Sequence, residues 1–304
     1  MYLHNNLDLL RTYIEITHDR TNLARSVIEK DYYVTIILRL IKQKSTDLGD
    51  VVFKGGTSLS KCYKVIDRFS EDIDISFTEH IGEKRRKKLK YDVMKSSSGE
   101  LNLPIKNWDF IQSDRDLNSY LFDYASLFEA SNIVLRDGVK VETALASYSF
   151  PTETMQILSF VGETFMLENS VLAKQYFLEP FEMKVQSLER TFIDKVYASC
   201  DYYIQKKSRR LSRHLYDLYK IFPKMTFDEN FKNLVYEVKE HRSTLSICPS
   251  SKTGVNINSL IKQFCSDNFY KADFDIITET LINEEVEYSE VIDTMLQIAD
   301  FDFW

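Results

Sequence analysis

The residues best suited to chemistry lie in one short stretch, Val51–Phe77, with the sequence VVFKGGTSLSKCYKVIDRFSEDIDISF. Asp72 and Asp74 alternate with Ile73 and Ile75, and this period of two predicts a β-strand with both carboxylates on one face. The two carboxylates would lie about 7 Å apart along the strand. Because Mg²⁺ prefers oxygen ligands of this kind, the pair predicts a divalent-metal site.

A phosphate-binding turn is predicted ahead of the two carboxylates. The apolar run Val51–Phe53 predicts a buried strand, residues 55–58 read GGTS, and Leu59–Ile66 has helical character. Glycine lets backbone N–H groups approach an anion closely, and a helix N-terminus favours a phosphate. Each feature alone is more often an ordinary turn or a solvated strand face. Their order, strand, GGTS, helix and Asp-x-Asp, favours nucleotide chemistry.

The string GGTSLSK…RFSEDIDI closely resembles the AbiEii-type nucleotidyltransferases, toxins of type IV toxin–antitoxin and abortive-infection systems in the DNA polymerase β-like superfamily. The family motif, GGT-x-L, a helix, then R-x-S-x-D-[ILV]-D-[LI], is matched without a gap. Weaker matches extend over residues 25–220. The resemblance implies an α+β fold, in which a small mixed sheet is flanked by helices. It also implies a nucleotidyltransferase core with N-terminal helices over residues 1–175 and a helical C-terminal subdomain over 176–304 that completes the cleft.

Two elements around the core motif add to the resemblance. The sequence EKDYYV at residues 29–34 resembles the family's EKDYWV element, which would buttress the nucleotide loop; the alternative is a packing helix with a charged first half. In Val139–Thr143, apolar residues alternate with Lys140 and Glu142. The polymerase β-like fold carries a third carboxylate on a strand beside the Asp-x-Asp strand, and Glu142 is the candidate. Its alternative role is that of a surface strand residue.

Two helical elements further along resemble the parts of the family that contact the triphosphate. LERTFIDK at 188–195 resembles L-x-x-T-x-x-x-K, which implies that Lys195 contacts phosphates; alone, it would be an ordinary exposed lysine. RRLSRHLYDL at 209–218 resembles R-x-x-R-[DH]-x-x-D-L, which implies that Asp217 holds Lys195 or an arginine in place. The alternative is a local ion pair between Arg213 and Asp217. Many family members carry aspartate where this chain has His214.

Residue chemistry and resemblance together predict Mg²⁺-dependent transfer of an NMP from an NTP to a hydroxyl acceptor, with Mn²⁺ as an alternative metal. The family implies an RNA acceptor such as a tRNA 3′ end, and a cognate antitoxin partner. Alternatives are nucleotidylation of a protein side chain, a nucleotide-binding module without catalysis, and a structural partner of an antitoxin. The predicted metal ligands are Asp72, Asp74 and Glu142, the further catalytic residues are Lys195 and Asp217, and the nucleotide-binding residues are Gly55, Gly56, Thr57, Ser58, Arg68, Ser70 and Lys195.

Composition sets the broad class of protein. The chain has 304 residues, of which 44% are hydrophobic and 28% charged, as in ordinary globular proteins, and the net charge of −7 argues against non-specific binding to a polyanion. Four scattered cysteines without a CxxC motif suggest neither a zinc site nor a disulfide framework, and favour a reduced cytoplasm. The start MYLHNNLDLL does not have the pattern of a signal peptide, and no apolar run is long enough for a membrane helix.

The remaining pattern is mostly helical, with β-like runs in the middle of the chain. Residues 81–95 are strongly basic, and this run is either a solvated helix face or mobile segment, or a surface that attracts RNA phosphates. Residues 96–106 are predicted to be a loop, the chain is predicted to become helical after Pro180, and Phe301–Trp304 either docks or frays. Helices are predicted over 5–18, 22–44, 188–203, 227–239, 260–265 and 287–299, a loop over 246–254, and β-runs over Tyr120–Tyr124, Ile133–Leu135 and Val139–Leu145, with a hairpin turn at Asp137-Gly138.

Overall fold

The chain forms two compact units. The computed structural model describes residues 1–112, 117–128, 135–146 and 148–304, so Ile133 and Val134 of the predicted β-run lie outside the described residues. Unit 1 comprises Met1–Cys62 and Ser70–Gln186, and unit 2 comprises Tyr63–Phe69 and Ser187–Trp304. The chain therefore leaves unit 1 for seven residues and returns, which places Arg68 in unit 2 and the Asp72/Asp74 pair in unit 1.

Unit 1 is built on a six-stranded mixed sheet with the strand order β3-β4-β2-β1-β6-β5. The central strand β1 pairs antiparallel with β2 and parallel with β6, while β2 pairs parallel with β4. The predicted α+β fold with a mixed sheet is thus confirmed. The strands are β1 (Val51–Lys54), β2 (Ile73–Phe77), β3 (Leu117–Phe122), β4 (Val139–Ala144), β5 (Thr152–Ile157) and β6 (Phe181–Gln186).

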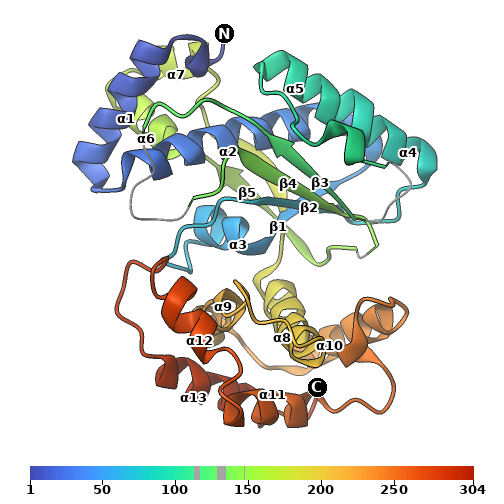
Figure 1. Cartoon of the computed structure of the whole chain (residues 1–304). Helices are drawn as coiled ribbons and strands as arrows, with labels where there is room; N and C mark the ends of the chain where they lie inside the picture. The colour runs from blue at the N-terminus through green and yellow to red at the C-terminus, as the bar shows by residue number, and fades with distance from the viewer. Residues whose placement is uncertain (113–116, 129–134, 147) are drawn as a thin grey trace. The chain divides into compact units, whose positions relative to one another are not determined.

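The helix α2 (Arg25–Lys44) is the buried support of this sheet. Apolar residues recur along it at spacings of three and four, and every residue from Ser26 to Ile41 is buried. Figure 1 shows α2 crossing unit 1 with α4 and α5 on one side and α1, α6 and α7 on the other. Besides α2, the helices and helical turns up to Gln175 are η1 (Leu3–Asn5), α1 (Leu7–Thr21), η2 (Thr46–Leu48), α3 (Gly55–Ser58), η3 (Leu59–Tyr63), α4 (Glu83–Lys88), η4 (Leu89–Lys95), α5 (Ser96–Leu101), η5 (Trp108–Phe110), α6 (Phe160–Glu168) and α7 (Ser170–Gln175).

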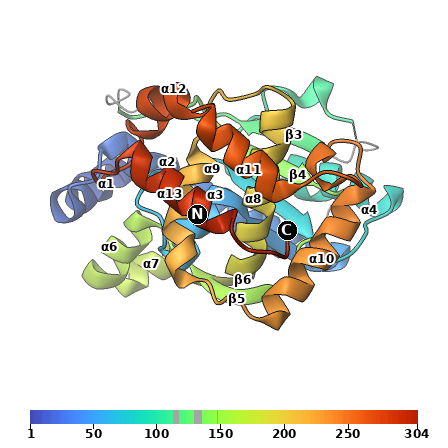
Figure 2. The same ribbon diagram turned by 90° about the horizontal axis from the view of Figure 1, so that it is seen from below.

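Unit 2 is helical, with α8 (Leu188–Ile204) packed against α9, α10 and α11 (Figure 2). The last four residues dock rather than fray. Trp304 is buried, its indole Nε1 donates to the carbonyl of Ile298 at 2.9 Å, and its ring lies beside Phe192 and Phe231. The other elements are α9 (Arg213–Ile221), η6 (Phe222–Lys224), α10 (Glu229–Ser243), η7 (Pro249–Ser251), α11 (Ile257–Ser266), α12 (Lys271–Asp273), η8 (Phe274–Thr278) and α13 (Tyr288–Ile298).

Some predicted elements are wrong. The predicted loop 96–106 begins with the helix α5, because Ser97 and Leu101 turn inward and are buried. The chain after Pro180 first forms the strand β6, where Phe181, Met183 and Val185 alternate with polar residues. The helix predicted over 59–66 begins at Gly55 and ends at Tyr63.

The predicted two-residue turn at Asp137-Gly138 is also wrong. The antiparallel partner of β4 is β3, with Phe122 opposite Val139, so the connection between them runs from residue 123 to 138. Gly138 does have a left-handed φ of +66°, and an added Cβ would meet the carbonyl of Phe122 at 2.3 Å. Among the described residues, no helix is long and apolar enough to cross a membrane.

The docked C-terminus should stabilise unit 2. We expect Trp304→Ala to lower the free energy of unfolding by about 3 kcal/mol, because it removes a buried aromatic ring and leaves a cavity. Urea unfolding followed by circular dichroism measures this. The control is Leu296→Ala, since Leu296 is 37% exposed and should cost much less. Equal losses in the two variants would show that the terminus does not pack as described.

Candidate active site

The turn after β1 is shaped by the close approach of a carboxylate. Lys54, the last residue of β1, pairs with Asp74 of β2 across the antiparallel ladder. Gly55 follows with a left-handed φ of +82°, and a Cβ placed there would lie 2.1 Å from Oδ2 of Asp74. Only glycine satisfies both the backbone conformation and the space. The carboxylate of Asp74 therefore lies directly against the start of α3.

Hydroxyl groups fasten this turn to the strand that carries the carboxylates. The Thr57 hydroxyl is 2.9 Å from the Ser70 hydroxyl and 2.5 Å from the carbonyl oxygen of Asp72. Ser58 donates to the carbonyl of Gly55 at 2.9 Å. The first N–H groups of a helix have no partner within it, so the start of α3 offers backbone donors to an anion. The structure thus brings the predicted phosphate turn and the predicted carboxylate pair together.

Three carboxylates gather on one side of the sheet. Asp74 lies opposite Glu142 in the parallel register of β2 and β4, and Asp72 lies immediately before β2. Burial, followed by the nearby charges of Glu142 and Asp72, raises the pKa of Asp74 to about 6. The Oδ1 atom of Asp72 is buried and has no hydrogen-bond partner among the described residues. The surroundings of Asp74 therefore disfavour its charged form.

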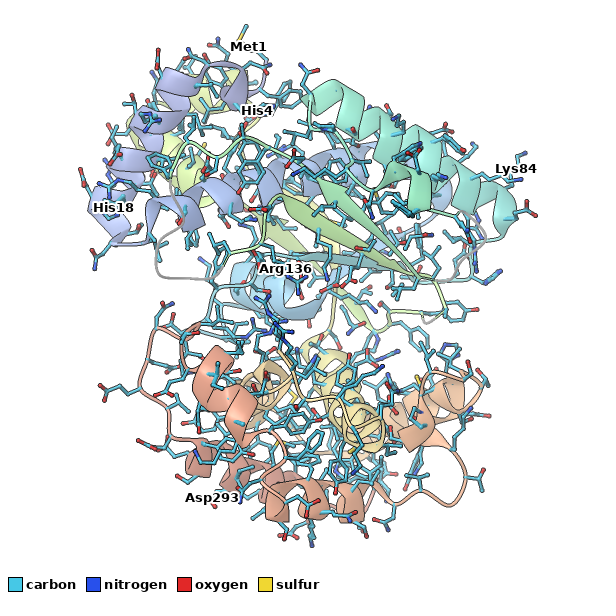
Figure 3. All side chains as sticks on the ribbon, viewed as in Figure 1. Met1, His4, His18, Lys84, Arg136 and Asp293 are labelled. Atoms are coloured by element: carbon cyan, nitrogen blue, oxygen red, sulfur yellow. The ribbon has the colours of Figure 1, made fainter. Side chains whose placement is uncertain are left out.

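Two cations that the sequence analysis did not single out partly neutralise this cluster. The Lys140 Nζ lies 3.0 Å from Oε2 of Glu142 and 3.4 Å from Oδ2 of Asp72. Arg136, labelled beside α3 in Figure 3, brings Nη1 to 3.6 Å from the same oxygen of Asp72. The strand alternation that singled out Glu142 also places Lys140 on its face, two residues earlier. That signal was present in the sequence.

The donor atoms suit Mg²⁺, but they are not arranged as a complete metal site. No group of three or more His, Cys, Asp or Glu side chains in the described part of the chain is placed to hold a metal ion. Asp72 and Asp74 fit best, because both are oxygen donors and Asp72 has an unsatisfied buried oxygen. The third predicted ligand, Glu142, is paired with Lys140, so it would have to exchange that partner to join a metal.

Buried charged residues near the start of α2 bind segments that lie around the carboxylate cluster. Asp31 pairs with Lys61, which follows the GGTS turn, and accepts from the backbone N–H of Phe160 at 2.9 Å. Lys30 is 1% exposed and donates to the backbone carbonyls of Arg136 and Gly138. These are residues of the EKDYYV element. The helix is therefore both a packing helix and a support for the segments around the carboxylates.

Glu71 completes this support beside the carboxylate pair. Its Oε2 accepts from the backbone N–H of Arg136 at 2.9 Å and lies 3.5 Å from the Nζ of Lys30. The backbone N–H and carbonyl of Arg136 are thus both held by buried charged side chains. These bonds fix the backbone of Arg136, and its side chain lies near Asp72.

In unit 2, a second charged group joins three residues predicted for the site. Asp217 accepts a bidentate pair of bonds from Arg68, each 2.7 Å long, and a third bond of 2.6 Å from Lys195. All three side chains are buried. The interpretation of Lys195 as an ordinary exposed lysine is therefore wrong. Asp217 also holds Lys195 and an arginine, Arg68, as the family resemblance implied.

The pKa shifts in this group follow from burial and charge. Burial alone would raise the pKa of Asp217, but Arg68 and Lys195 outweigh it and hold that pKa well below its usual range. Burial, together with the charge of Arg68, lowers the pKa of Lys195 despite the attraction of Asp217. Burial and the charge of Lys195 hold the pKa of His214 far below its usual value. The neutral His214 ring lies 3.5 Å from the Lys195 Nζ.

The sequence matches a known protein family over most of its length. The family described as nucleotidyl transferase AbiEii toxin, type IV toxin–antitoxin system, matches residues 39–299. The chain belongs to the AbiEii family. It is thus a nucleotidyltransferase toxin of a type IV toxin–antitoxin system, as the motif resemblance predicted. No curated protein sequence matches it.

A solved structure supports the fold expected for this family. MenT4, a nucleotidyltransferase toxin from Mycobacterium tuberculosis H37Rv, superposes with a TM-score of 0.58 and covers 96% of this chain and 90% of its own. The two sequences are 20% identical, so this likeness concerns the fold. The AbiEii chain and MenT4 thus share an arrangement of strands and helices over nearly their whole lengths.

Removing the charge of Asp74 should stabilise the metal-free AbiEii protein. A carboxylate whose pKa is raised from 3.8 to about 6 on folding costs stability as the pH rises between these two values; the cost is fully present above about pH 6 and absent below the unfolded value. We expect Asp74→Asn to raise the free energy of unfolding by about 1–2 kcal/mol at alkaline pH, and by less under acidic conditions. Thermal unfolding at several pH values measures this.

The control for this experiment is Asp92→Asn at an exposed position, which should change little at any pH. Because Asp74 is a predicted metal ligand, we also expect Mg²⁺ with an NTP to stabilise this variant less than the parent protein. A variant that is less stable than the parent at alkaline pH would contradict the description of the cluster.

Asp217 should be essential to the folding of unit 2. We expect Asp217→Ala to cost about 3–5 kcal/mol, because it leaves the buried cations Arg68 and Lys195 without their counter-charge. Denaturant unfolding measures the loss. Asp293→Ala provides the control, since Asp293 lies at the surface of α13 (Figure 3). A similar, small loss in both variants would mean that the buried group does not form.

Proposed function

We propose that this AbiEii chain transfers an NMP from an NTP to a hydroxyl of an RNA acceptor, such as a tRNA 3′ end, in a Mg²⁺-dependent reaction. The observation that carries the proposal is the placement of Asp74 against Gly55, which sets a carboxylate cluster beside the backbone donors of the GGTS turn. The turn suits phosphates and the carboxylates suit a cation. A metal-bound nucleoside triphosphate presents both.

The residues of unit 1 would take distinct roles. Asp72 and Asp74 hold the metal, with Mn²⁺ as an alternative to Mg²⁺, and the backbone N–H groups of residues 55–58 bind phosphate oxygens. When bound, the metal neutralises charge on the reacting phosphate and on the leaving pyrophosphate. Glu142 accepts the proton of the attacking hydroxyl once Lys140 releases it. Ser70 acts through Thr57, by fixing the turn against the carboxylate strand.

Lys195 would supply positive charge to the triphosphate. Its bond to the carboxylate of Asp217, 2.6 Å long, holds the Nζ group in a fixed position. Arg68, which occupies both oxygens of Asp217, is a positioning residue for Lys195. The protein would act in the cytoplasm, since its four free cysteines suit a reducing compartment, and its toxicity would be controlled by a cognate antitoxin.

Label transfer tests the reaction. The protein is incubated with Mg²⁺, each α-³²P-labelled NTP in turn, and total bacterial tRNA. We expect label on the RNA with the parent protein, and a loss of about a thousandfold or more in the Asp72→Asn/Asp74→Asn variant, because the metal loses both of its ligands. Asp293→Asn is the control for charge removal elsewhere.

Other outcomes of the same experiment point to other functions. Label found on protein would indicate that the acceptor is a protein side chain and not RNA. No transfer, combined with thermal stabilisation by Mg²⁺ and an NTP, would indicate a nucleotide-binding module without catalysis. Transfer that persists in the double variant would contradict the assignment of Asp72 and Asp74 as metal ligands.

A further inference from the structure

The helix formed by α4 and η4 concentrates positive charge on a chain that is acidic overall. Residues 83–95 include seven basic and two acidic residues, whereas the whole chain has 39 lysines and arginines against 46 aspartates and glutamates. Because the chain is acidic overall, this concentration of positive charge is a local feature. Unit 1 therefore presents one segment that is suited to a negatively charged partner.

The arginines of this segment bind the protein itself. Arg85 donates to the carbonyl of Leu48 at 3.1 Å and pairs with Glu79, and Arg86 donates to the carbonyl of Ile81 at 2.8 Å. Lys90 likewise donates to the carbonyl of Ile111 at 2.6 Å, but the lysines nearer the start of the segment do not share this role. Lys84 and Lys88 have no hydrogen-bond or ion-pair partner in the described residues, and Lys87 has only the exposed i, i+4 partner Glu83. Figure 3 shows Lys84 at the outer end of α4, pointing away from the ribbon.

Aromatic side chains lie close to lysines of this segment. Tyr91 is 53% exposed and its ring meets that of Trp108 edge-on, with 5.7 Å between centroids. Lys95 and Lys90 place their Nζ atoms 4.6 and 4.9 Å from the Trp108 ring. Phe110, in the same short turn as Trp108, is 79% exposed. The surface is thus both cationic and aromatic.

The π-helical geometry of η4 explains how these groups meet. A π-helix has hydrogen bonds from residue i to i+5, so its turn is wider than that of an α-helix. Lys95 consequently lies one turn beyond Lys90 and Tyr91, and all three gather at Trp108. Such segments are rare and often occur at functional sites. An α-helical spacing would separate Lys90 from Lys95.

We propose that this basic–aromatic face, formed by Lys84, Lys87, Lys88, Tyr91, Lys95 and Trp108, is a docking surface for unpaired RNA. The lysines contact backbone phosphates and Tyr91 stacks on a base, the combination by which proteins hold single-stranded nucleic acid. The inference rests on the proposed RNA acceptor and assigns it a place on unit 1. Double-stranded nucleic acid fits less well, because its bases are not free to stack on a side chain.

Binding of RNA in the absence of NTP and Mg²⁺ tests the face separately from the reaction. The probe is a fluorescein-labelled single-stranded RNA of mixed sequence, followed by anisotropy at several salt concentrations. We expect Lys84→Gln/Lys87→Gln/Lys88→Gln to weaken binding about tenfold or more and to reduce the salt slope by about 2, since each phosphate contact contributes about 0.7 on single strands. Tyr91→Ala should weaken binding about fivefold or more with little change in slope.

The matched control removes three exposed lysines elsewhere, in Lys174→Gln/Lys224→Gln/Lys262→Gln, and should bind like the parent protein. Thermal unfolding of each variant confirms that it is folded. The proposal is overturned if the face variant binds RNA as tightly as the parent, or if the control loses as much affinity. Binding of the parent to phosphatidylglycerol vesicles but not to RNA would overturn it in favour of a membrane surface.

Label transfer with the same variants separates this inference from the proposed reaction. If the face variant binds RNA more weakly than the parent but no variant transfers label, the docking surface is supported and the proposed reaction is contradicted. If the face variant transfers label with an unchanged KM for RNA, the proposed reaction is supported and the docking surface is contradicted. A raised KM with little change in kcat is the expected result, because the face binds the acceptor away from the reacting atoms.

Discussion

The contact between Asp74 and the backbone of Gly55 constrains the rest of unit 1. It requires glycine at position 55, an antiparallel register that sets Lys54 opposite Asp74, and a helix that starts immediately after β1. A register slip of one residue would turn Asp72 and Asp74 to the opposite face of the sheet. The strand and turn at 51–58 and the strand that carries Asp74 therefore depend on one another within unit 1.

The two acidic centres differ in how their surroundings treat negative charge, one around the fully buried Asp217 and one around the partly exposed Asp74. Asp217 meets Arg68 and Lys195, and its pKa falls below the usual range. Asp74 meets Glu142 and Asp72, and its pKa rises. Since a shift records which charge state the surroundings favour, the group around Asp217 favours the carboxylate, whereas the surroundings of Asp74 disfavour it. A divalent cation would favour the charged form of Asp74, in the same direction as the charges of Lys54 and Lys140.

Local patterns predicted the elements that carry the carboxylates, but not the cations around them. The alternation in DIDI and in VKVET predicted β2 and β4, and three- and four-residue spacing predicted α2. The strand β6 was missed because its alternation was short and lay next to a long helix. The pairing of Asp217 with Arg68 joins residues 149 positions apart, and no local period encodes such a contact. The family motif identified both residues, and the structure supplied their geometry.

The charged first half of α2 shows why a sequence pattern can mislead about burial. Glu29, Lys30 and Asp31 would ordinarily face solvent, yet each is buried and bonded to a segment outside the helix. Such burial is tolerated because every charge has a partner, and the loss of one partner leaves the other uncompensated. Apolar residues at these positions would preserve the packing of α2 but would release the backbone of Arg136, Gly138 and Phe160. The charges are thus placed to fix irregular segments beside the carboxylates, a role that helix packing alone does not require.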